Sequence, residues 1–297
     1  MSKILIVGGT GLTGAHAALH LRELGEDVTV MSRYAAVPSC LQGFDHLIGN
    51  YLDDSVDQQT LEKFDRLVFA AGADIRLLPP EENEDAFFER VNSLAIPAFF
   101  QRVKAAGIKR AVYIGTYYPQ MVPEKIATSA YVRSRHLADE GLRALSDETF
   151  SVCSLNAPFI LGHVPGIELP HIEVLVQYAA GRLEGMPLVA PAGGVNHISS
   201  GSMSQAIAAA LDHGEGGKAY LVGDENLSWK TYLEHYFRSA GNPMDLDVSE
   251  DEHPLFPDVM LYAGRNAVVH YEPDDADLGY ARNAMGACIE EIVNFYL

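Results

Sequence analysis

The stretch ILIVGGTGLTG, residues 4–14, decides the fold of this chain. Its first four residues form a continuous apolar run, which is typical of a strand buried on both faces of a parallel sheet. The glycines fit the pattern G-x-G-x-x-G, and residues 15–25 predict a helix that ends at a glycine. Such glycines let the backbone approach a pyrophosphate, while the start of the helix offers amide donors and the positive end of a dipole. This order of strand, turn and helix therefore predicts a dinucleotide site at Gly8, Gly9, Thr10, Gly11, Leu12 and Gly14.

The end of the second predicted strand, residues 27–33, selects which dinucleotide fits. An acidic residue at this place binds the 2′-hydroxyl of the ribose, whereas an arginine accommodates a 2′-phosphate. The sequence has Ser32 and Arg33 here, with no acidic residue directly after them. We therefore expect the chain to prefer NADP, with NAD as the less favoured cofactor.

Strands and helices alternate six times in the first half of the chain. Further strands are predicted at 46–54 (with its loop), 66–73, 109–116 and 150–158, and helices at 60–64, 84–107 and 129–145. This alternation predicts an α/β fold with a doubly wound parallel sheet of the Rossmann type. Pro97 should kink or shift the long helix at 84–107, because proline cannot donate to the helical ladder.

The regular alternation ends near residue 156, after which prolines become frequent. We predict a dinucleotide-binding domain over residues 1–156 and a smaller substrate-binding part over 157–297. Some segments of the second part should pack back on the first. Its clearest patterns predict helices at 202–214, 228–241 and 286–297, a strand at 218–223, and a loop in the acidic stretch 243–258.

The composition excludes several classes of function. The chain has 297 residues and a net charge of −19, from 40 acidic residues against 21 lysines and arginines. A surface of that sign repels nucleic acid and anionic membranes, so neither is an expected partner. The three cysteines form no C-x-x-C pair, no histidine spacing suits a metal, and no signal peptide or spanning segment is predicted. We expect a protein of the reducing cytoplasm, without a metal.

Several further segments resemble the extended short-chain dehydrogenase/reductase superfamily, in its NAD-dependent epimerase/dehydratase-like group. Besides the glycine turn, they are LVFAAGA at 67–73, RVNSLAIPAFFQRVKAAGIKRAVYIGT at 90–116, NAPFILGHVPG at 156–166 and NHISSGSMSQAIAAAL at 196–211. The family reduces ketones, epimerises sugars and dehydrates them on one scaffold. The resemblance therefore implies the fold more narrowly than the reaction.

The resemblance also implies roles for individual residues. Thr116 stands where the family has a serine or threonine that hydrogen-bonds the substrate carbonyl, and Tyr131 stands where it has the acid/base tyrosine. Asn92 matches a family asparagine, for which a structural role within the helix is the favoured alternative. The residues expected to line the cofactor are Asn50, Tyr51, Ala70, Ala71, Gly72, Asn92, Pro158, Phe159 and Ile160.

Three departures from the family pattern bear on the reaction. Arg135 replaces the active-site lysine, which keeps a cation beside Tyr131 but not a group that readily gives up a proton. The Arg-Pro of the substrate loop is Ala157-Pro158, and two acids of the next segment are serines, Ser199 and Ser200. With so few cations for a diphosphate, a nucleotide-sugar substrate is disfavoured.

Three interpretations stay open at this point. In the first, which we favour, Tyr131 protonates a developing alkoxide with help from Arg135 and Thr116. In the second, another side chain does acid/base work in an epimerisation, dehydration or isomerisation; the candidates are Tyr117, Tyr118, His163, His171 and His197. In the third, the chain binds NADP without turnover and acts as a redox sensor or interaction partner.

The favoured interpretation predicts an NADP-dependent oxidoreductase for a small, largely uncharged carbonyl compound or secondary alcohol. The resemblance further implies a homodimer, because in this family the helices corresponding to 84–107 and 129–145 commonly pair across a two-fold axis.

Overall fold

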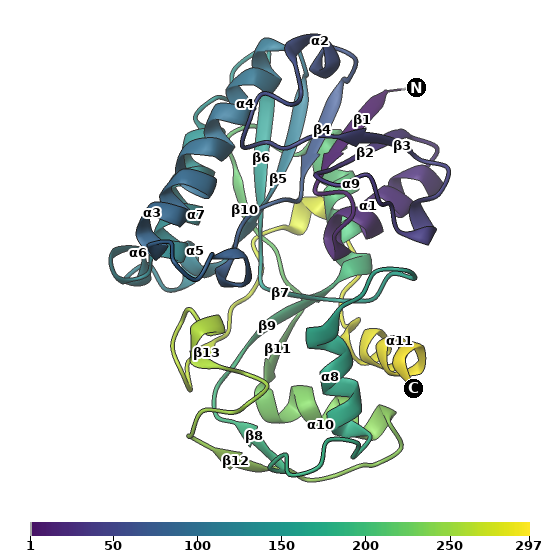
Figure 1. The fold of residues 1–297 in the computed structure, drawn as a ribbon, viewed down its shortest axis with the longest axis vertical. Helices are drawn as coiled ribbons and strands as arrows, with labels where there is room; N and C mark the ends of the chain where they lie inside the picture. Colours follow the sequence, from purple (N-terminus) through teal and green to yellow (C-terminus); the bar gives the residue numbers. More distant parts are fainter. Residues whose placement is uncertain (1) are drawn as a thin grey trace.

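A seven-stranded parallel sheet forms the larger part of the computed structural model, which describes residues 2–297 (Figure 1). The strands lie in the order β10-β6-β5-β4-β1-β2-β3, and every neighbouring pair is parallel. Their bounds are β1 (Lys3–Val7), β2 (Asp27–Ser32), β3 (Asp45–Ile48), β4 (Arg66–Phe69), β5 (Arg110–Thr116), β6 (Ser151–Ala157) and β10 (Ala219–Leu221). The prediction of a doubly wound α/β fold is confirmed.

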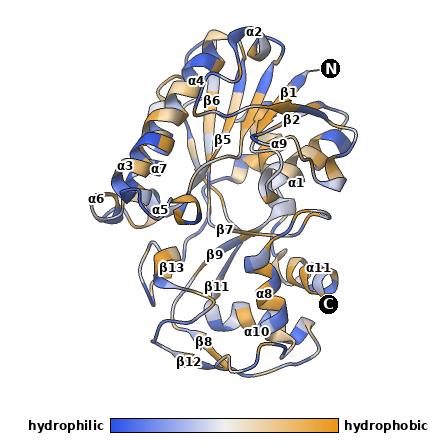
Figure 2. Ribbon diagram, in the orientation of Figure 1, coloured by the Kyte–Doolittle hydropathy of each residue, from blue (hydrophilic) through white to orange (hydrophobic). Residues whose placement is uncertain are grey.

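Helices cover both faces of this sheet. Helix α1 (Leu12–Glu23) and helix α9 (Ser200–His213) share a core with Ile4 and Ile6, whereas α4 (Ala95–Ala105) and α7 (Ala130–Arg143) share one with Leu5 and Val7. Alternate residues of β1 therefore point to opposite layers, and all four are at most 2% exposed. The apolar run in the sequence arises because both faces of the strand are buried, as the colouring of the central strands shows (Figure 2).

The long helix predicted at 84–107 is divided by a π-helical turn. Helix α3 (Glu84–Phe88) leads into η3 (Glu89–Leu94), which is π-helical, and then into α4. Pro97 lies in the first turn of α4, and its ring would meet the carbonyl of Ser93 in a regular helix. Since Ser93 lies inside the π-helical turn, the helix absorbs the proline by widening instead of ending.

The second part of the chain forms a smaller body beneath the sheet (Figure 1). Its strands are β7 (Phe159–Leu161), β8 (Val189–Pro191), β9 (Gly194–Ser199), β11 (Glu225–Ser228), β12 (Asp247–Ser249) and β13 (Val268–Val269). Its core is built on helices α8 (Pro170–Ala179), α10 (Trp229–Ser239) and α11 (Met285–Tyr296). Strand β10 and helix α9 also come from residues 157–297, yet they belong to the large sheet and its cover.

The prediction of a loop throughout 243–258 was wrong at Asp247–Ser249. These residues form β12, which pairs in parallel with β8. Two three-residue strands far apart in the chain leave no periodic pattern, so only the tertiary fold brings them together. The shorter helical elements are α2 (Gln58–Leu61), α5 (Tyr118–Met121), α6 (Lys125–Thr128) and the 3-10 turns η1 (Ser39–Leu41), η2 (Ile75–Leu77), η4 (Asp258–Met260) and η5 (Ala276–Leu278). Over residues 2–297, no helix is long and apolar enough to cross a membrane.

Candidate active site

The glycine turn joins the end of β1 to the start of α1 in very little space. Gly8 has φ +78°, and a Cβ on it would lie 2.9 Å from the amide nitrogen of Ala71. A Cβ on Gly14 would lie 2.3 Å from the carbonyl oxygen of Gly8. Gly11 is the N-cap of α1 and supplies no side chain to its first amides. The turn therefore leaves the helix start open to an anionic ligand.

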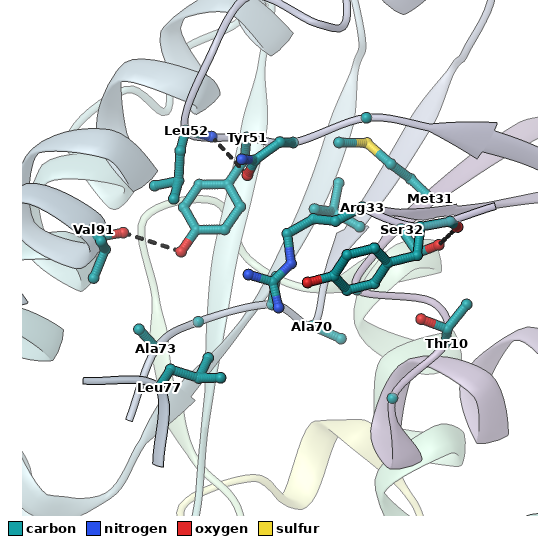
Figure 3. Close-up of a pocket in the computed structure, with 18 of the residues that line it drawn as sticks. Thr10, Met31, Ser32, Arg33, Tyr51, Leu52, Ala70, Ala73, Leu77 and Val91 are labelled. Atoms are coloured by element: carbon teal, nitrogen blue, oxygen red, sulfur yellow. Dashed lines mark hydrogen bonds between the residues drawn. The ribbon is translucent and has the colours of Figure 1, made fainter. Parts of the chain in front are cut away.

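A cavity of about 460 Å³ opens beside this turn, at the carboxyl ends of β1, β2 and β4 (Figure 3). Four expected groups line it: part of the glycine turn, the end of β2, the segment after β3 and the end of β4. The expected residues found there are Gly8, Thr10, Gly11, Ser32, Arg33, Asn50, Tyr51, Ala70, Ala71 and Gly72. This is where open α/β sheets bind their ligands.

Seven residues expected at the cofactor do not line this cavity; three of them, Pro158, Phe159 and Ile160, belong to the second cavity or to the core described below. Gly9 faces β2, since its Cβ would lie 2.7 Å from that of Val30, and Leu12 packs into the hydrophobic core. Gly14 contacts the backbone of Gly8. Asn92 is fully buried; its amide accepts from the backbone nitrogen of Ala73 and donates to the oxygen of the same residue, both at 3.1 Å. Asn92 thus holds the loop after β4, which is the structural alternative.

The end of β2 presents a cation to the cavity. In Figure 3 the side chain of Arg33 reaches into the space between the ends of β2 and β4. Ser32 is held by its Oγ, which donates to the carbonyl of Tyr34 at 2.9 Å and lies 2.8 Å from Nε2 of His46. Tyr34 is 70% exposed, with the Arg33 guanidinium 5.6 Å from its ring centre.

Several lining residues were not expected. They are Val7, Met31, Tyr34, Gly49, Leu52, Ala73, Leu77, Phe87, Arg90 and Val91. Phe87 and Val91 are one helical turn apart, so the helix that carries Asn92 already contained the spacing that would have found them. Leu77 belongs to the short turn η2, for which the sequence has no periodic signal.

A second cavity, of about 220 Å³, lies where β5 ends and α7 begins. Thr116 closes β5 and Tyr131 is the second residue of α7, and both line this space together with Pro158 and Phe159. Ser129 sets the start of α7 by accepting from the amide of Val132 at 3.3 Å. Ile160 was expected here but packs into the core behind α1 and α9.

Tyr131 sits among aromatic rings. Its ring stacks on that of Tyr262, with the centres 4.0 Å apart and the planes inclined by 16°, and it meets Phe88 edge-on at 5.5 Å. Burial raises the pKa of Tyr131, and the charge of Arg135 and a hydrogen bond from Thr116 offset part of this rise. The phenol is therefore a proton donor near neutral pH.

Arg135 lines neither cavity. Its Nη2 donates to the carbonyl of Ile114 at 2.6 Å, and a Cβ on Gly72 would lie 2.4 Å from its Nη1. The side chain is buried, with the guanidinium 5.3 Å from the ring centre of Tyr113. Asp139, one turn further along α7, forms an ion pair with Arg143 at 2.8 Å instead. Arg135 thus acts on Tyr131 through its positive charge, which lowers the pKa of the phenol, and not by lining the site.

The alternative acid/base residues have less suitable surroundings. Tyr117 and Tyr118 line the second cavity and burial raises the pKa of both, but of the three candidate tyrosines only Tyr131 has the charge of Arg135 to offset part of such a rise, and the hydroxyl of Tyr117 is inaccessible to solvent. Burial lowers the pKa of His197 to about 3, and this ring stacks on Tyr232 at 4.8 Å. His163 lines a third cavity, under α9 and α11, and burial lowers the pKa of His171. Within residues 2–297, no three His, Cys, Asp or Glu residues are grouped as metal ligands.

The model of the NAD dependent epimerase/dehydratase family matches residues 4–223, which span the sheet, the glycine turn, Thr116 and Tyr131. The chain belongs to this family. Its fold and the resemblance predicted from the motifs are thereby confirmed, whereas the family name covers more than one reaction.

Comparison with individual relatives agrees with the family. The chain is 27% identical over 212 residues to a UDP-glucose 4-epimerase from Streptomyces lividans, covering 62% of each chain. It is 23% identical over 260 residues to a protein of Synechocystis described as "Putative dihydroflavonol 4-reductase", covering 80% of this chain and 72% of that one. The Bordetella bronchiseptica enzyme WbmH, solved in complex with NAD+, superposes with a TM-score of 0.76 at 16% identity over 100% of this chain and 98% of its own. The last likeness concerns the fold alone.

Proposed function

We propose that this chain is an NADP-dependent oxidoreductase that acts on a carbonyl or secondary alcohol of a small, largely uncharged compound. The observation that carries the proposal is the placement of Thr116 and Tyr131 on one small cavity, next to a larger cavity at the glycine turn. Thr116 and Tyr131 can bind and protonate a substrate oxygen, and the glycine turn can hold a dinucleotide.

The larger cavity fits a dinucleotide by the chemistry of its lining. Gly8 and Gly11 leave room for a pyrophosphate against the open amides of α1. The relative WbmH binds NAD+, which supports a nicotinamide dinucleotide in this fold. Arg33 favours NADP, because a guanidinium directed into the cavity at the end of β2 can pair with a 2′-phosphate.

The chain's own residues supply the proton chemistry. When bound, the nicotinamide supplies a hydride to the carbonyl carbon. Thr116 would donate to the substrate oxygen, and the Tyr131 hydroxyl would pass its proton to that oxygen as the carbonyl bond becomes an alcohol. A phenol whose pKa is raised by burial is protonated at neutral pH, so the arrangement suits reduction. Arg135 would stabilise the tyrosinate that remains.

Two other functions keep some support. The likeness to the Streptomyces epimerase supports an epimerase. Arg76, the cation that lines the small cavity, counts against a nucleotide-sugar substrate, because both oxygens of Asp74 already hold it at 2.5–3.1 Å and it is not free to pair with a diphosphate. The inward position of Arg135, with a donor committed to Ile114, favours a sensor that binds NADP without turnover. The free thiols of Cys40, Cys153 and Cys288 accord with the cytoplasm that we propose as the compartment.

Titration of the purified protein with NADPH and NADH tests the cofactor, and absorbance at the nicotinamide band with a panel of ketones tests the reaction. We expect NADPH to bind more tightly than NADH. We also expect a ketone-dependent oxidation of NADPH, and the substitution Tyr131→Phe should slow this oxidation strongly. Tight NADPH binding without turnover of any ketone would favour the sensor, and full activity of the variant would remove Tyr131 from the mechanism.

A further inference from the structure

The small cavity is walled mainly by flat aromatic side chains. Its aromatic lining residues are Tyr117, Tyr118, Tyr131, Phe159 and Tyr262. Tyr262 connects two of the others, since it stacks on Tyr131 at 4.0 Å and receives the edge of Tyr118 at 5.6 Å with the planes inclined by 79°. We call these five aromatic lining residues the aromatic slot.

Tyr262 reaches the slot from a distant part of the chain. It follows the 3-10 turn η4, and its hydroxyl accepts from the amide of Ile75 at 3.3 Å. The loop after β4 therefore fixes one end of the ring while Tyr131 fixes its face. Because the ring is partly exposed and lines the cavity, the part of it that Tyr131 does not cover can contact a ligand.

The charges at the slot cancel. Over the described residues, the charged members of the lining are Asp74 and Arg76. Burial would raise the pKa of Asp74, but hydrogen bonds from Arg76 and its charge outweigh this and lower it, so the pair is ionised and closed on itself. An anionic substrate would have to break this pair, whereas a neutral aromatic ring would not.

The size of the cavity limits the substrate further. Its volume is about 220 Å³. A cavity of about 150 Å³ lined by apolar side chains is known to hold benzene, whereas drug-sized ligands occupy about 300 Å³ or more. The space therefore suits one aromatic ring with a short carbonyl-bearing side chain.

We propose that the substrate is an aryl carbonyl compound, or the corresponding aryl carbinol, and that Tyr262 determines this specificity. The inference rests on the proposed oxidoreductase function and narrows it. The carbonyl oxygen would lie at Thr116 and Tyr131, and the aryl ring would pack against Phe159 and Tyr262. An aromatic pair contributes about 0.5–1.5 kcal/mol beyond its buried area, which is a two- to twelvefold advantage over a saturated ring of the same carbon number.

The test compares acetophenone with cyclohexyl methyl ketone, which differ in the flatness and π-electrons of one six-membered ring. We expect kcat/KM of the full-length protein with NADPH to be at least twofold higher for acetophenone. Tyr262→Leu should bring the ratio to about one, and Tyr262→Phe should keep it. Phe295→Leu is the matched control, because this aromatic residue is 43% exposed on α11 and lines neither cavity.

A binding measurement separates this inference from the proposed function. Saturation-transfer NMR with 1-phenylethanol and 1-cyclohexylethanol reports contact with the protein without any turnover. If 1-phenylethanol binds more tightly than 1-cyclohexylethanol, and Tyr262→Leu removes this difference, the aryl specificity of the aromatic slot is supported even if no ketone is reduced. Equal kcat/KM for the two ketones in the wild-type protein would overturn the slot while leaving the oxidoreductase in place. An unchanged ratio in a folded Tyr262→Leu variant would remove Tyr262 from the specificity.

Discussion

The substitution Gly14→Ala tests the link between the glycine turn and the cofactor. A Cβ at this position would lie 2.3 Å from the carbonyl oxygen of Gly8 and 2.9 Å from Cα of Gly9, where 3.4 Å or more is ordinary contact. Both neighbours are backbone atoms that no rotamer can move, so α1 must retreat from the turn by roughly 1 Å. Overpacking of this kind costs about 1–3 kcal/mol, of which the helix propensity of alanine returns at most about 1 kcal/mol.

We therefore expect Gly14→Ala to lower the free energy of unfolding by about 1–2 kcal/mol and the Tm by about 2–8 °C. The same shift moves the first amides of α1, and losing one hydrogen bond to a charged phosphate should weaken NADPH binding by about tenfold or more. Differential scanning fluorimetry with and without NADPH measures both effects.

Two glycines provide matched controls for this measurement. A Cβ on Gly11 would lie 3.6 Å from the oxygen of Gly8, and Gly11 has φ −87°, so Gly11→Ala should keep the Tm. Because Gly11 lines the larger cavity, the added methyl group should weaken NADPH binding alone. Gly286 lies in α11 with no atom within 4 Å of an added Cβ, and its alanine variant should keep both properties or gain stability. The reasoning is refuted if Gly14→Ala keeps both the Tm and the NADPH affinity of the wild-type protein.

Four further predictions concern the reaction and the assembly. The rate of ketone reduction at saturating NADPH should be constant from about pH 6 to pH 9, because burial keeps the pKa of Tyr131 above its usual value near 10. Tyr131→Phe should slow this rate by about 10²- to 10⁴-fold. A rate profile with a midpoint near pH 7 that persists in the variant would contradict this role of Tyr131. Arg135→Met removes the charge that favours the tyrosinate, so alcohol oxidation near pH 9 should fall by a larger factor than reduction near pH 7, and equal losses would count against an electrostatic role. Arg33→Ala should raise the Kd of NADPH by about tenfold and leave that of NADH unchanged in fluorescence titrations, whereas a parallel loss would exclude a contact with the 2′-phosphate. We propose a homodimer through α4 and α7, where Leu137 is 46% exposed; light scattering should find a dimer that Leu137→Glu converts to a monomer, and a monomeric wild-type protein would end this proposal.

The sequence was sufficient to predict the large sheet because its strands are buried on both faces. Leu5 and Ile6 face opposite layers of the fold, so the run from 4 to 7 is apolar at every position. The seventh strand, β10, comes from residues 219–221, and its place beside β6 follows from tertiary packing that no local pattern records. The same holds for the paired strands β8 and β12, which have three residues each.

The two cavities were predictable to different degrees. Thr116 and Tyr131 are brought together because one ends a strand and the other begins the next long helix, and family motifs identify both places. Tyr262 carries no such signal: it lies in an irregular segment, and its stacking on Tyr131 exists only once the second part of the chain has folded against the first. Residues that lie in irregular loops are those most able to set specificity without changing the fold.

Arg135 fits this chain because of Gly72. The planar fork of arginine is larger than the lysine ammonium, and one of its nitrogens occupies the space that a side chain at residue 72 would need. From there the guanidinium donates to the carbonyl of Ile114, and its charge acts on Tyr131 although the side chain does not line the larger cavity. The electrostatic part of the lysine role can therefore persist, while binding of the ribose has to come from other donors. A proton relay through this residue is excluded by the chemistry of arginine, so a reduction in which Tyr131 itself supplies the proton makes the least demand on the substituted position.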